Sequence, residues 1–383
     1  MQTSRERLLA ALKHQEPDRV PLDLASTQVT GISLTAYNNL CEHIGFVDEQ
    51  PHICDAIQHI CLPHDELLQR FGVDTRGLWP RMNHTDFVDE DAGGYLSHVD
   101  EWGFAYRIKK DGGLWYDLYA SPLEHKTLSK SLIENYPWPH GGDKGRIDDL
   151  RRQALAFREQ GYAVVLKSIC AGLFEMMIRL RGMQNAMTDL LADPVHAGLL
   201  LDKILQHKID YWDMALSELG DVVDVIAEGD DFGTQTSQLI SIDTFRQIIK
   251  PRQAGLIRFM RQKAPNAFVF FHSCGNVRDF LPDFIDMGVD IINPVHITAT
   301  GMAPGQLKKD FGKDIIFWGG GVDAQETLPH GTPQQVSDEV KRHLDIFAPG
   351  GGYVFNTIHN IQADVPPENI VAMYETLSKY GTY

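Results

Sequence analysis

Hydrophobic and polar positions follow two alternating patterns along the chain: short apolar runs, and longer segments whose apolar residues recur every three or four positions. The first pattern is typical of buried strands and the second of helices. The eight predicted strands are residues 20–25, 72–78, 163–168, 222–227, 267–272, 290–293, 315–318 and 352–355. Eight strands that alternate with helices predict an α/β fold, a distorted (β/α)8 TIM-like barrel. An open doubly wound sheet is the alternative, which is disfavoured because no Gly-x-Gly-x-x-Gly follows a strand.

Three segments stand outside this alternation. Thr3-x-x-Glu6 is a capping box, which predicts an amphipathic helix ahead of the first strand. Residues 28–66 are expected to be helical and irregular. Residues from about 84 to 123 alternate and are rich in aromatic side chains around Lys110-Asp111-Gly112-Gly113, which predicts a β-hairpin insertion. With these additions, residues 1–383 are expected to form a single domain.

The composition excludes several classes of partner. The formal net charge of −17 at pH 7 disfavours binding to nucleic acid or to an anionic membrane. The apolar runs are shorter than the roughly 20 residues of a membrane span, and the first residues lack the apolar region of a signal peptide. The five cysteines are scattered and form no CxxC pair, so no disulfide framework is expected. These features predict a reduced, cytoplasmic protein.

Polar residues gather at the carboxyl ends of the predicted strands, where the catalytic groups of (β/α)8 barrels lie. Because side chains alternate along an extended backbone, His272 and Cys274 point the same way, and zinc prefers imidazole and thiolate ligands. Asp230 lies at another strand end and has an ordinary alternative role, capping backbone N–H groups. The other candidates at strand ends are Asp23, Glu228, Asp231, Gln235, Asn293, His296, Asp323 and His359.

A metal site with three protein ligands would need one more residue beside His272 and Cys274. From the strand ends, that ligand is His359, Glu228 or His296. Three ligands and one open position are the pattern of a catalytic zinc site. Each of these residues also has a purely structural explanation, since a histidine can simply pack and a carboxylate can bind backbone N–H groups.

The chain resembles the uroporphyrinogen decarboxylase superfamily over nearly its whole length. The segments that carry the resemblance are Arg5-Glu6-Arg7-Leu8, Pro17-Asp18-Arg19-Val20-Pro21, Gly229-Asp230-Asp231-Phe232-Gly233-Thr234-Gln235, Phe271-His272-Ser273-Cys274-Gly275, Gly319-Gly320-Gly321-Val322-Asp323 and Pro366-Pro367-Glu368-Asn369. The resemblance implies a distorted (β/α)8 barrel with one of two chemistries. Decarboxylases of this family grip a polycarboxylate through arginines in a Met-Arg-Gln-Ala-Gly-Arg segment after the first strand. This chain has residues 22–28 there, Leu-Asp-Leu-Ala-Ser-Thr-Gln, without an arginine.

The second branch of the family, the zinc- and cobalamin-dependent methyltransferases, is more similar. Its members carry His-x-Cys after the fifth strand and a third ligand, usually Cys, after the eighth. His272 and Cys274 match the first two ligands, and His359 stands at the third position. The resemblance therefore implies a zinc-dependent methyltransferase that moves a methyl group between a small molecule (a methyl ether, amine, alcohol or thiol) and a corrinoid protein.

The resemblance also implies roles for the remaining candidates. Glu228, Asp231 and His296 are expected to be catalytic, with Glu228 as a labile fourth ligand or a proton acceptor. The expected substrate-binding residues are Asp23, Gln235, Asn293 and Asp323. The chain has no glycine-rich segment for S-adenosylmethionine and no Asp-x-His-x-x-Gly for cobalamin, so the corrinoid is expected on a separate partner protein. A uroporphyrinogen decarboxylase is the alternative, and a metal-binding protein without turnover is a third. A homodimer is compatible with these features, but the sequence leaves the quaternary state open.

Overall fold

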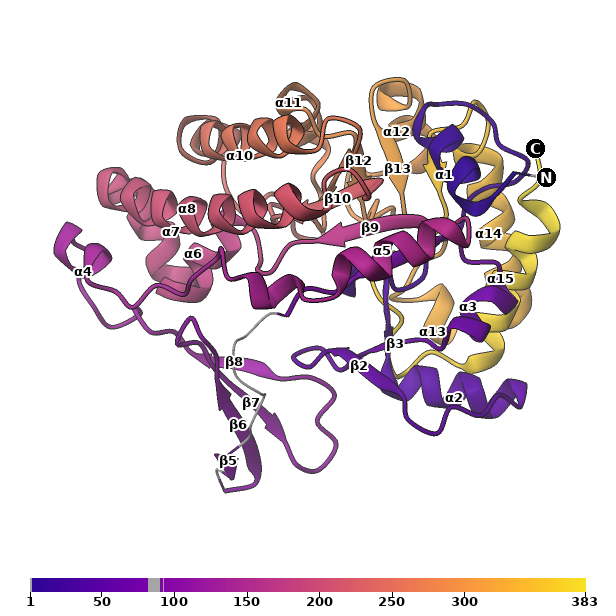
Figure 1. Cartoon of the computed structure of the whole chain (residues 1–383), viewed down its shortest axis with the longest axis horizontal. Coiled ribbons are helices and arrows are strands. Elements are labelled where there is room, and N and C mark those ends of the chain that lie inside the picture. The colour runs from indigo at the N-terminus through magenta and orange to yellow at the C-terminus, as the bar shows by residue number, and fades with distance from the viewer. Residues whose placement is uncertain (1, 82–89, 92) are drawn as a thin grey trace.

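A curled parallel sheet forms the centre of the protein. The computed structural model describes residues 2–81, 90–91 and 93–383 (Figure 1). The sheet has seven strands in the order β14-β13-β12-β11-β10-β9-β4. Their bounds are β4 Thr75–Leu78, β9 Ala163–Lys167, β10 Val225–Gly229, β11 Phe268–His272, β12 Ile291–Asn293, β13 Ile316–Trp318 and β14 Tyr353–Val354. Each strand lies within or overlaps a predicted run, and the predicted α/β, barrel-like class is confirmed.

The predicted first strand closes the sheet but is shorter than expected. Leu22 pairs in parallel with Phe355, just after β14, through a single bridge. Phe355 N donates to Pro21 O at 2.8 Å, and Asp23 N donates to Phe355 O at 3.0 Å. On the other side, Asp74 N donates to Leu22 O at 2.8 Å just before β4. The segment therefore lies between the two edge strands, and Pro21 shortens it because proline has no N–H for the ladder.

Helices surround the sheet (Figure 1). They are α1 Ser4–Leu12, α2 Leu34–Ile44, α3 Asp65–Phe71, α4 Lys130–Glu134, α5 Leu150–Glu159, α6 Leu173–Arg181, α7 Met183–Ala192, α8 Pro194–Leu219, α9 Ile242–Thr244, α10 Lys250–Lys263, α11 Leu281–Met287, α12 Pro304–Phe311, α13 Thr327–His330, α14 Pro333–Phe347 and α15 Pro367–Tyr380. Among the described residues, no helix combines the length and the hydropathy that crossing a membrane would require.

Alternate residues along each strand belong to two different apolar clusters. Val225, Ala227 and Phe270 belong to a cluster inside the barrel, whereas Ile226 and Phe271 belong to the layer between the sheet and the helices. This division follows from the period-two alternation of side chains along a strand. It determines which strand-end residues face the barrel interior and which face the helices.

Helix α1 covers the amino-terminal end of the barrel. The predicted capping box is present: Glu6 N donates to the Thr3 hydroxyl at 3.2 Å, and Thr3 N donates to the Glu6 carboxylate at 2.8 Å. Leu8 and Leu12 pack into the interior cluster.

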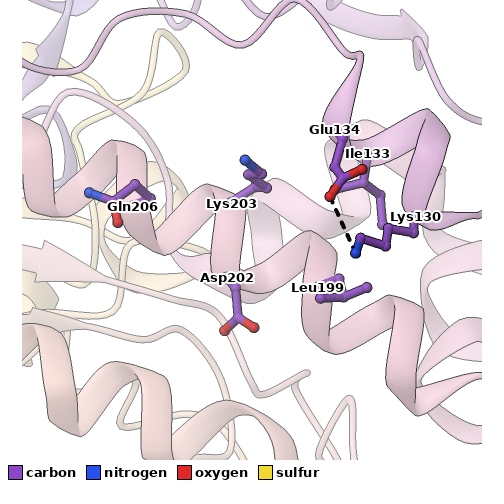
Figure 2. Close-up of a pocket in the computed structure, with 7 residues that line it drawn as sticks. All are labelled: Lys130, Ile133, Glu134, Leu199, Asp202, Lys203 and Gln206. Atoms are coloured by element: carbon purple, nitrogen blue, oxygen red, sulfur yellow. Dashed lines mark ion pairs between the residues drawn. The ribbon is translucent and has the colours of Figure 1, made fainter.

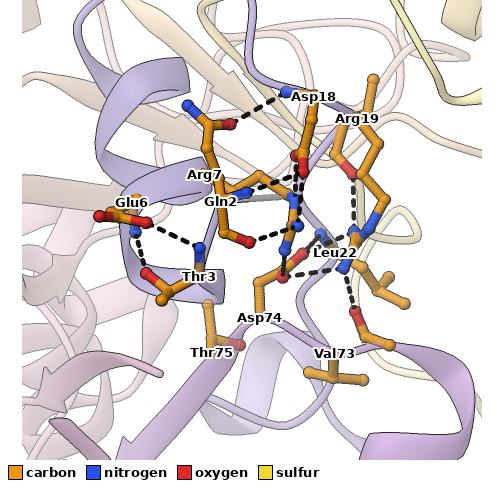
Figure 3. Close-up of polar contacts among 12 residues, drawn as sticks. Gln2, Thr3, Glu6, Arg7, Asp18, Arg19, Leu22, Val73, Asp74 and Thr75 are labelled. Atoms are coloured by element: carbon orange, nitrogen blue, oxygen red, sulfur yellow. Dashed lines mark hydrogen bonds and ion pairs between the residues drawn. The ribbon is translucent and has the colours of Figure 1, made fainter. Parts of the chain in front are cut away.

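Ion pairs attach this end of the chain to β4 (Figure 3). The buried Asp74 carboxylate contacts Arg7 Nη1 at 2.7 Å and Arg19 Nη1 at 2.8 Å. Arg7 Nε also contacts Asp18 at 2.6 Å. Two guanidinium groups therefore compensate the buried charge of Asp74, as a buried carboxylate requires.

The predicted hairpin insertion is a four-stranded antiparallel sheet that projects from the side of the barrel (Figure 1). Its strands are β5 Glu90–Asp91, β6 Tyr95–Val99, β7 Ala105–Lys109 and β8 Asp117–Ala120. The predicted turn at 110–113 joins β7 to β8, whereas the predicted start near residue 84 lies outside the described residues. The prediction for residues 28–66 missed a three-stranded sheet of β1 Ile32–Ser33, β2 His52–Asp55 and β3 Ile60–Leu62. Tyr116 N donates to Ile57 O at 2.8 Å, which connects these two small sheets.

His207, buried in α8, should make stability depend on pH. Burial lowers its pKa to about 3, and its ring packs edge-on against Trp102 at 4.5 Å. In the unfolded chain a histidine titrates near pH 6.5, so the unfolded state binds the proton first as pH falls. This contribution is complete above pH 6.5 and is lost as pH falls toward 3. Between pH 7 and pH 5 we expect the wild type to lose about 2 kcal/mol more stability than His207→Gln.

Urea unfolding of both proteins at pH 7 and pH 5 measures this difference. His43→Gln, at an exposed position, is the control and should follow the wild type. An equal loss of stability in wild type and His207→Gln would contradict the assignment.

Candidate metal centre

Three side chains converge at the carboxyl end of the barrel. His272 is the last residue of β11, Cys274 follows two residues later, and His359 lies in the loop after β14. One ligand atom of each residue lies within 4.8 Å of the other two. Cys274 Sγ is 3.3 Å from His272 Nε2, and the two imidazole centroids are 5.3 Å apart. The structure thus brings together the three residues that the sequence suggested as ligands.

Local backbone geometry places these side chains. His272 follows Phe270 on the interior side of β11, as the alternation predicts. Gly275 then turns the chain with φ +80°, and a Cβ there would come within 2.5 Å of the Gly233 backbone. His359 also has a positive φ, of +67°. Such a conformation is unfavourable for a residue with a side chain and is often found at functional sites.

The protonation states of the three groups suit a divalent cation. Burial lowers the pKa of His272 and lowers that of His359 to about 4, so both imidazoles are neutral at pH 7. Burial also raises the pKa of the Cys274 thiol, and the nearby Asp231 carboxylate raises it further. A bound cation would offset the cost of ionising this thiol.

The donor set fits zinc. Two imidazoles and one thiolate are ligands of catalytic zinc sites, which keep a fourth position open. Ligand atoms of a tetrahedral zinc site lie about 3.3 to 3.8 Å apart, as follows from the usual bond lengths. The separation of 3.3 Å between Cys274 Sγ and His272 Nε2 is at the short end of this range, and the three ligand atoms together lie within 4.8 Å of one another.

Two of the predicted catalytic residues lie beside this group. Asp231 Oδ1 accepts a hydrogen bond from Cys274 N at 2.8 Å and lies 3.8 Å from His272 Nε2. A third of the Asp231 side chain, 34%, is exposed, which leaves it accessible to a substrate. Gly275 N donates to His296 Nδ1 at 3.2 Å. Both residues therefore hold the turn that carries Cys274.

Gln325 connects three of the predicted residues, although the sequence did not single it out. Its side-chain Oε1 accepts from Gln235 Nε2 at 2.6 Å and lies 3.4 Å from His296 Nε2. Its backbone N donates to Asp323 Oδ1 at 2.9 Å. The predicted substrate-binding residues Gln235 and Asp323 therefore belong to a polar network that reaches His296. The only signal in the sequence was the position of Gln325, two residues after Asp323.

The expected role of Glu228 disagrees with the structure. Ala227 faces the barrel interior, so Glu228 faces the helices on the other side of the sheet. Its carboxylate contacts Lys208 Nζ at 2.7 Å, Trp212 Nε1 at 2.5 Å and the Ser168 hydroxyl at 3.0 Å. Glu228 thus joins α8 to the sheet and is neither a fourth ligand nor a proton acceptor at this centre.

The expected contact of Asp23 with substrate is also inconsistent with its surroundings. Asp23 is fully buried, and each carboxylate oxygen accepts two hydrogen bonds. The donors are Ser26 N at 3.2 Å, Ser26 Oγ at 2.8 Å, Thr75 Oγ1 at 2.5 Å and Trp318 Nε1 at 3.0 Å. These bonds use the accepting capacity of the carboxylate, so Asp23 stabilises the barrel instead.

Asn293 contacts the candidate ligand His272. It is fully buried, and its Oδ1 lies 2.6 Å from His272 Nδ1. Its amide is therefore used to connect His272 to β12, and its burial does not suit the expected contact with substrate.

Helix α6 contributes two charged residues that the sequence did not indicate. Burial and the nearby Asp231 carboxylate raise the pKa of Glu175. Arg179 Nη2 lies 3.6 Å from Glu175, and Arg179 Nη1 lies 3.5 Å from the hydroxyl of Tyr106 in the insertion. The start of α6 is held by Asp230, which accepts from the backbone N of Glu175 at 2.9 Å, the capping role that the sequence allowed.

A separate groove lies on the outside of α8 (Figure 2). It has a volume of about 220 Å³ and none of the three candidate ligands lines it. Its lining residues are Lys130, Ile133, Glu134, Leu199, Asp202, Lys203 and Gln206. The groove is therefore distinct from the candidate metal centre.

Comparison with known proteins defines the family. A sequence model of the uroporphyrinogen decarboxylase (URO-D) family matches residues 144–380. The chain therefore belongs to the URO-D family, as the resemblance indicated. A uroporphyrinogen decarboxylase from Chromohalobacter salexigens is 23% identical over 387 residues, and the match covers 98% of this chain and 98% of that protein. A second one, from Pseudoalteromonas translucida, is 43% identical over 58 residues, which span 14% of this chain and only 16% of that protein.

A solved structure supports the same fold. A methyltransferase from Methanosarcina mazei superimposes with a TM-score of 0.64 at 21% sequence identity, covering 99% of each chain. At this level of identity the similarity concerns the fold.

Proposed function

We propose that the protein is a zinc-dependent methyltransferase that exchanges a methyl group between a small molecule and a corrinoid carried by a partner protein. The observation that carries the proposal is the convergence of His272, Cys274 and His359. This donor set suits a zinc ion with one open position. The Methanosarcina mazei methyltransferase shares the fold, which shows that this fold can host methyl transfer.

The residues around the centre have distinct tasks in this proposal. Zinc, when bound, supplies Lewis acidity that lowers the pKa of a substrate thiol or stabilises a leaving alkoxide. His272, Cys274 and His359 would hold it. Asp231 accepts a proton at its carboxylate, because burial raises its pKa and part of the side chain remains exposed. His296 keeps the Cys274 turn in place through Gly275 N.

Uroporphyrinogen decarboxylation is the second candidate, favoured by the names of the sequence relatives. That substrate carries several carboxylates, which need cationic partners when they are buried. Residues 22–28 supply no arginine, and the carboxylate of Asp23 already occupies this part of the barrel. A polyanion placed there would lose several kcal/mol for each uncompensated charge.

Parallel assays of the purified protein distinguish the two functions. We expect about one zinc per chain by elemental analysis when chelators are omitted. We also expect the absorbance of methyl-Co(III) after mixing with a Co(I) corrinoid and a methyl donor. Uroporphyrinogen should keep its carboxylates under the same conditions. The proposal would be refuted if the zinc-loaded protein formed no methyl-Co(III) with methoxyarenes, methylamines, methanol or methyl thiols. Stepwise decarboxylation of uroporphyrinogen would also refute it.

A further inference from the structure

Asn293 connects His272 to the neighbouring strand in the barrel interior. His272 and Asn293 are register partners on β11 and β12. Asn293 Oδ1 lies 2.6 Å from His272 Nδ1, and Asn293 Nδ2 donates to the Trp318 carbonyl at 2.9 Å. Asn293 is fully buried, so water does not compete for these bonds.

The chemistry of these groups determines the tautomer of His272. A backbone carbonyl only accepts hydrogen bonds, so the Trp318 carbonyl must face the amide NH2 of Asn293. The amide oxygen then faces His272 and can only accept, so Nδ1 of His272 carries the hydrogen. A neutral imidazole has one N–H, which leaves the lone pair on Nε2, 3.3 Å from Cys274 Sγ.

Trp318 gives this connection a fixed support. Its indole Nε1 donates to Asp23 at 3.0 Å, and Trp318 pairs with Val354 between β13 and β14. The Trp318 carbonyl, which accepts the hydrogen bond from the Asn293 amide, therefore belongs to a residue whose side chain and backbone are both fixed by hydrogen bonds. Outer partners of this kind orient metal-binding histidines and commonly change metal affinity 10- to 100-fold when they are removed.

We propose that Asn293 is a positioning residue that fixes His272 in the Nδ1–H tautomer and presents the Nε2 lone pair to the metal position. The consequence for zinc rests on the proposed function above. The tautomer itself is a property of the metal-free protein and can be measured without zinc.

The ring 15N chemical shifts of His272 in the metal-free protein at pH 8 report its tautomer directly. We expect Nδ1–H in the wild type and in Asn293→Asp, whose carboxyl group accepts from Nδ1 through one oxygen and, when protonated, donates from the other to the Trp318 carbonyl. Asn293→Ala should show a mixture of tautomers. Zinc affinity, measured by competition with a chromophoric chelator, should fall 10- to 100-fold in Asn293→Ala and stay within about threefold of wild type in Asn293→Asp.

Asn369→Ala is the matched control for loss of a buried asparagine. Asn369 donates to the Leu328 and Gly331 carbonyls at 2.8 Å each and does not contact the centre. It should lower stability without changing the tautomer or the zinc affinity. An Nε2–H tautomer in the wild type overturns the proposal without any variant. An unchanged tautomer in Asn293→Ala also overturns it. If the tautomer shifts while the wild type binds no zinc, the positioning role stands and the zinc function fails.

Discussion

Replacing Cys274 with serine should reduce bound zinc from about one per chain to a small fraction of that value. The thiolate is the only sulfur ligand in the group, and a serine hydroxyl does not ionise at neutral pH, so two imidazoles remain. Methyl transfer should fall with the metal content. The fold should survive, because Cys274 is partly exposed and lies in a turn. Elemental analysis after dialysis, together with thermal unfolding, measures both effects.

Cys54→Ser is the control for this substitution. Cys54 is also partly exposed, and its thiol donates to the Ile60 carbonyl at 3.4 Å in the small sheet of β1 to β3. It should keep full zinc content. His359→Ala should lose zinc like Cys274→Ser. Full metal retention in Cys274→Ser would remove the basis of the assignment.

Replacing Glu228 with alanine should lower the free energy of unfolding by about 3 to 5 kcal/mol. Glu228 and Lys208 form a buried ion pair at 2.7 Å, with 3% and 1% of their side chains exposed. Alanine leaves the Lys208 ammonium buried and removes the acceptor of the Trp212 indole N–H. Zinc content should not change, because Glu228 faces α8 and not the metal centre.

The double variant Lys208→Met with Glu228→Leu tests the cause of this loss. It removes both charges while keeping their volume, so it should recover much of the stability that Glu228→Ala loses. Chemical unfolding followed by circular dichroism measures all three proteins. Normal stability with lost zinc in Glu228→Ala would instead restore the role expected from the sequence.

The strands were predictable because a parallel strand is buried on both faces and appears as an apolar run. The first strand was overestimated because Pro21 interrupts the ladder, and the pairing partner Phe355 is far away in the sequence. β2 was missed because it is short and largely exposed, with no run of apolar residues. Its formation depends on pairing with β3, which a local pattern does not reveal.

The same distinction applies to the site. The alternation of side chains along an extended backbone was enough to predict that His272 and Cys274 point to the same side of the strand. It also contained the signal against Glu228, because Ala227 and Glu228 must face opposite sides of the sheet. The role of Asn293 depends on the Trp318 carbonyl, which is 25 residues away and has no local sequence signal.

The closure of the barrel has a consequence for synthesis of the protein on the ribosome. The segment around Leu22 finds its partner only at Phe355, and Asn356 Nδ2 donates to Asp23 O across 333 residues. At roughly 5 to 20 residues per second, translation needs tens of seconds to produce that partner. During this time the segment around Leu22 lacks the backbone and side-chain partners that Phe355 and Asn356 provide. The nascent chain therefore presents an open strand edge of the kind that chaperones bind, and complete closure follows the emergence of β14.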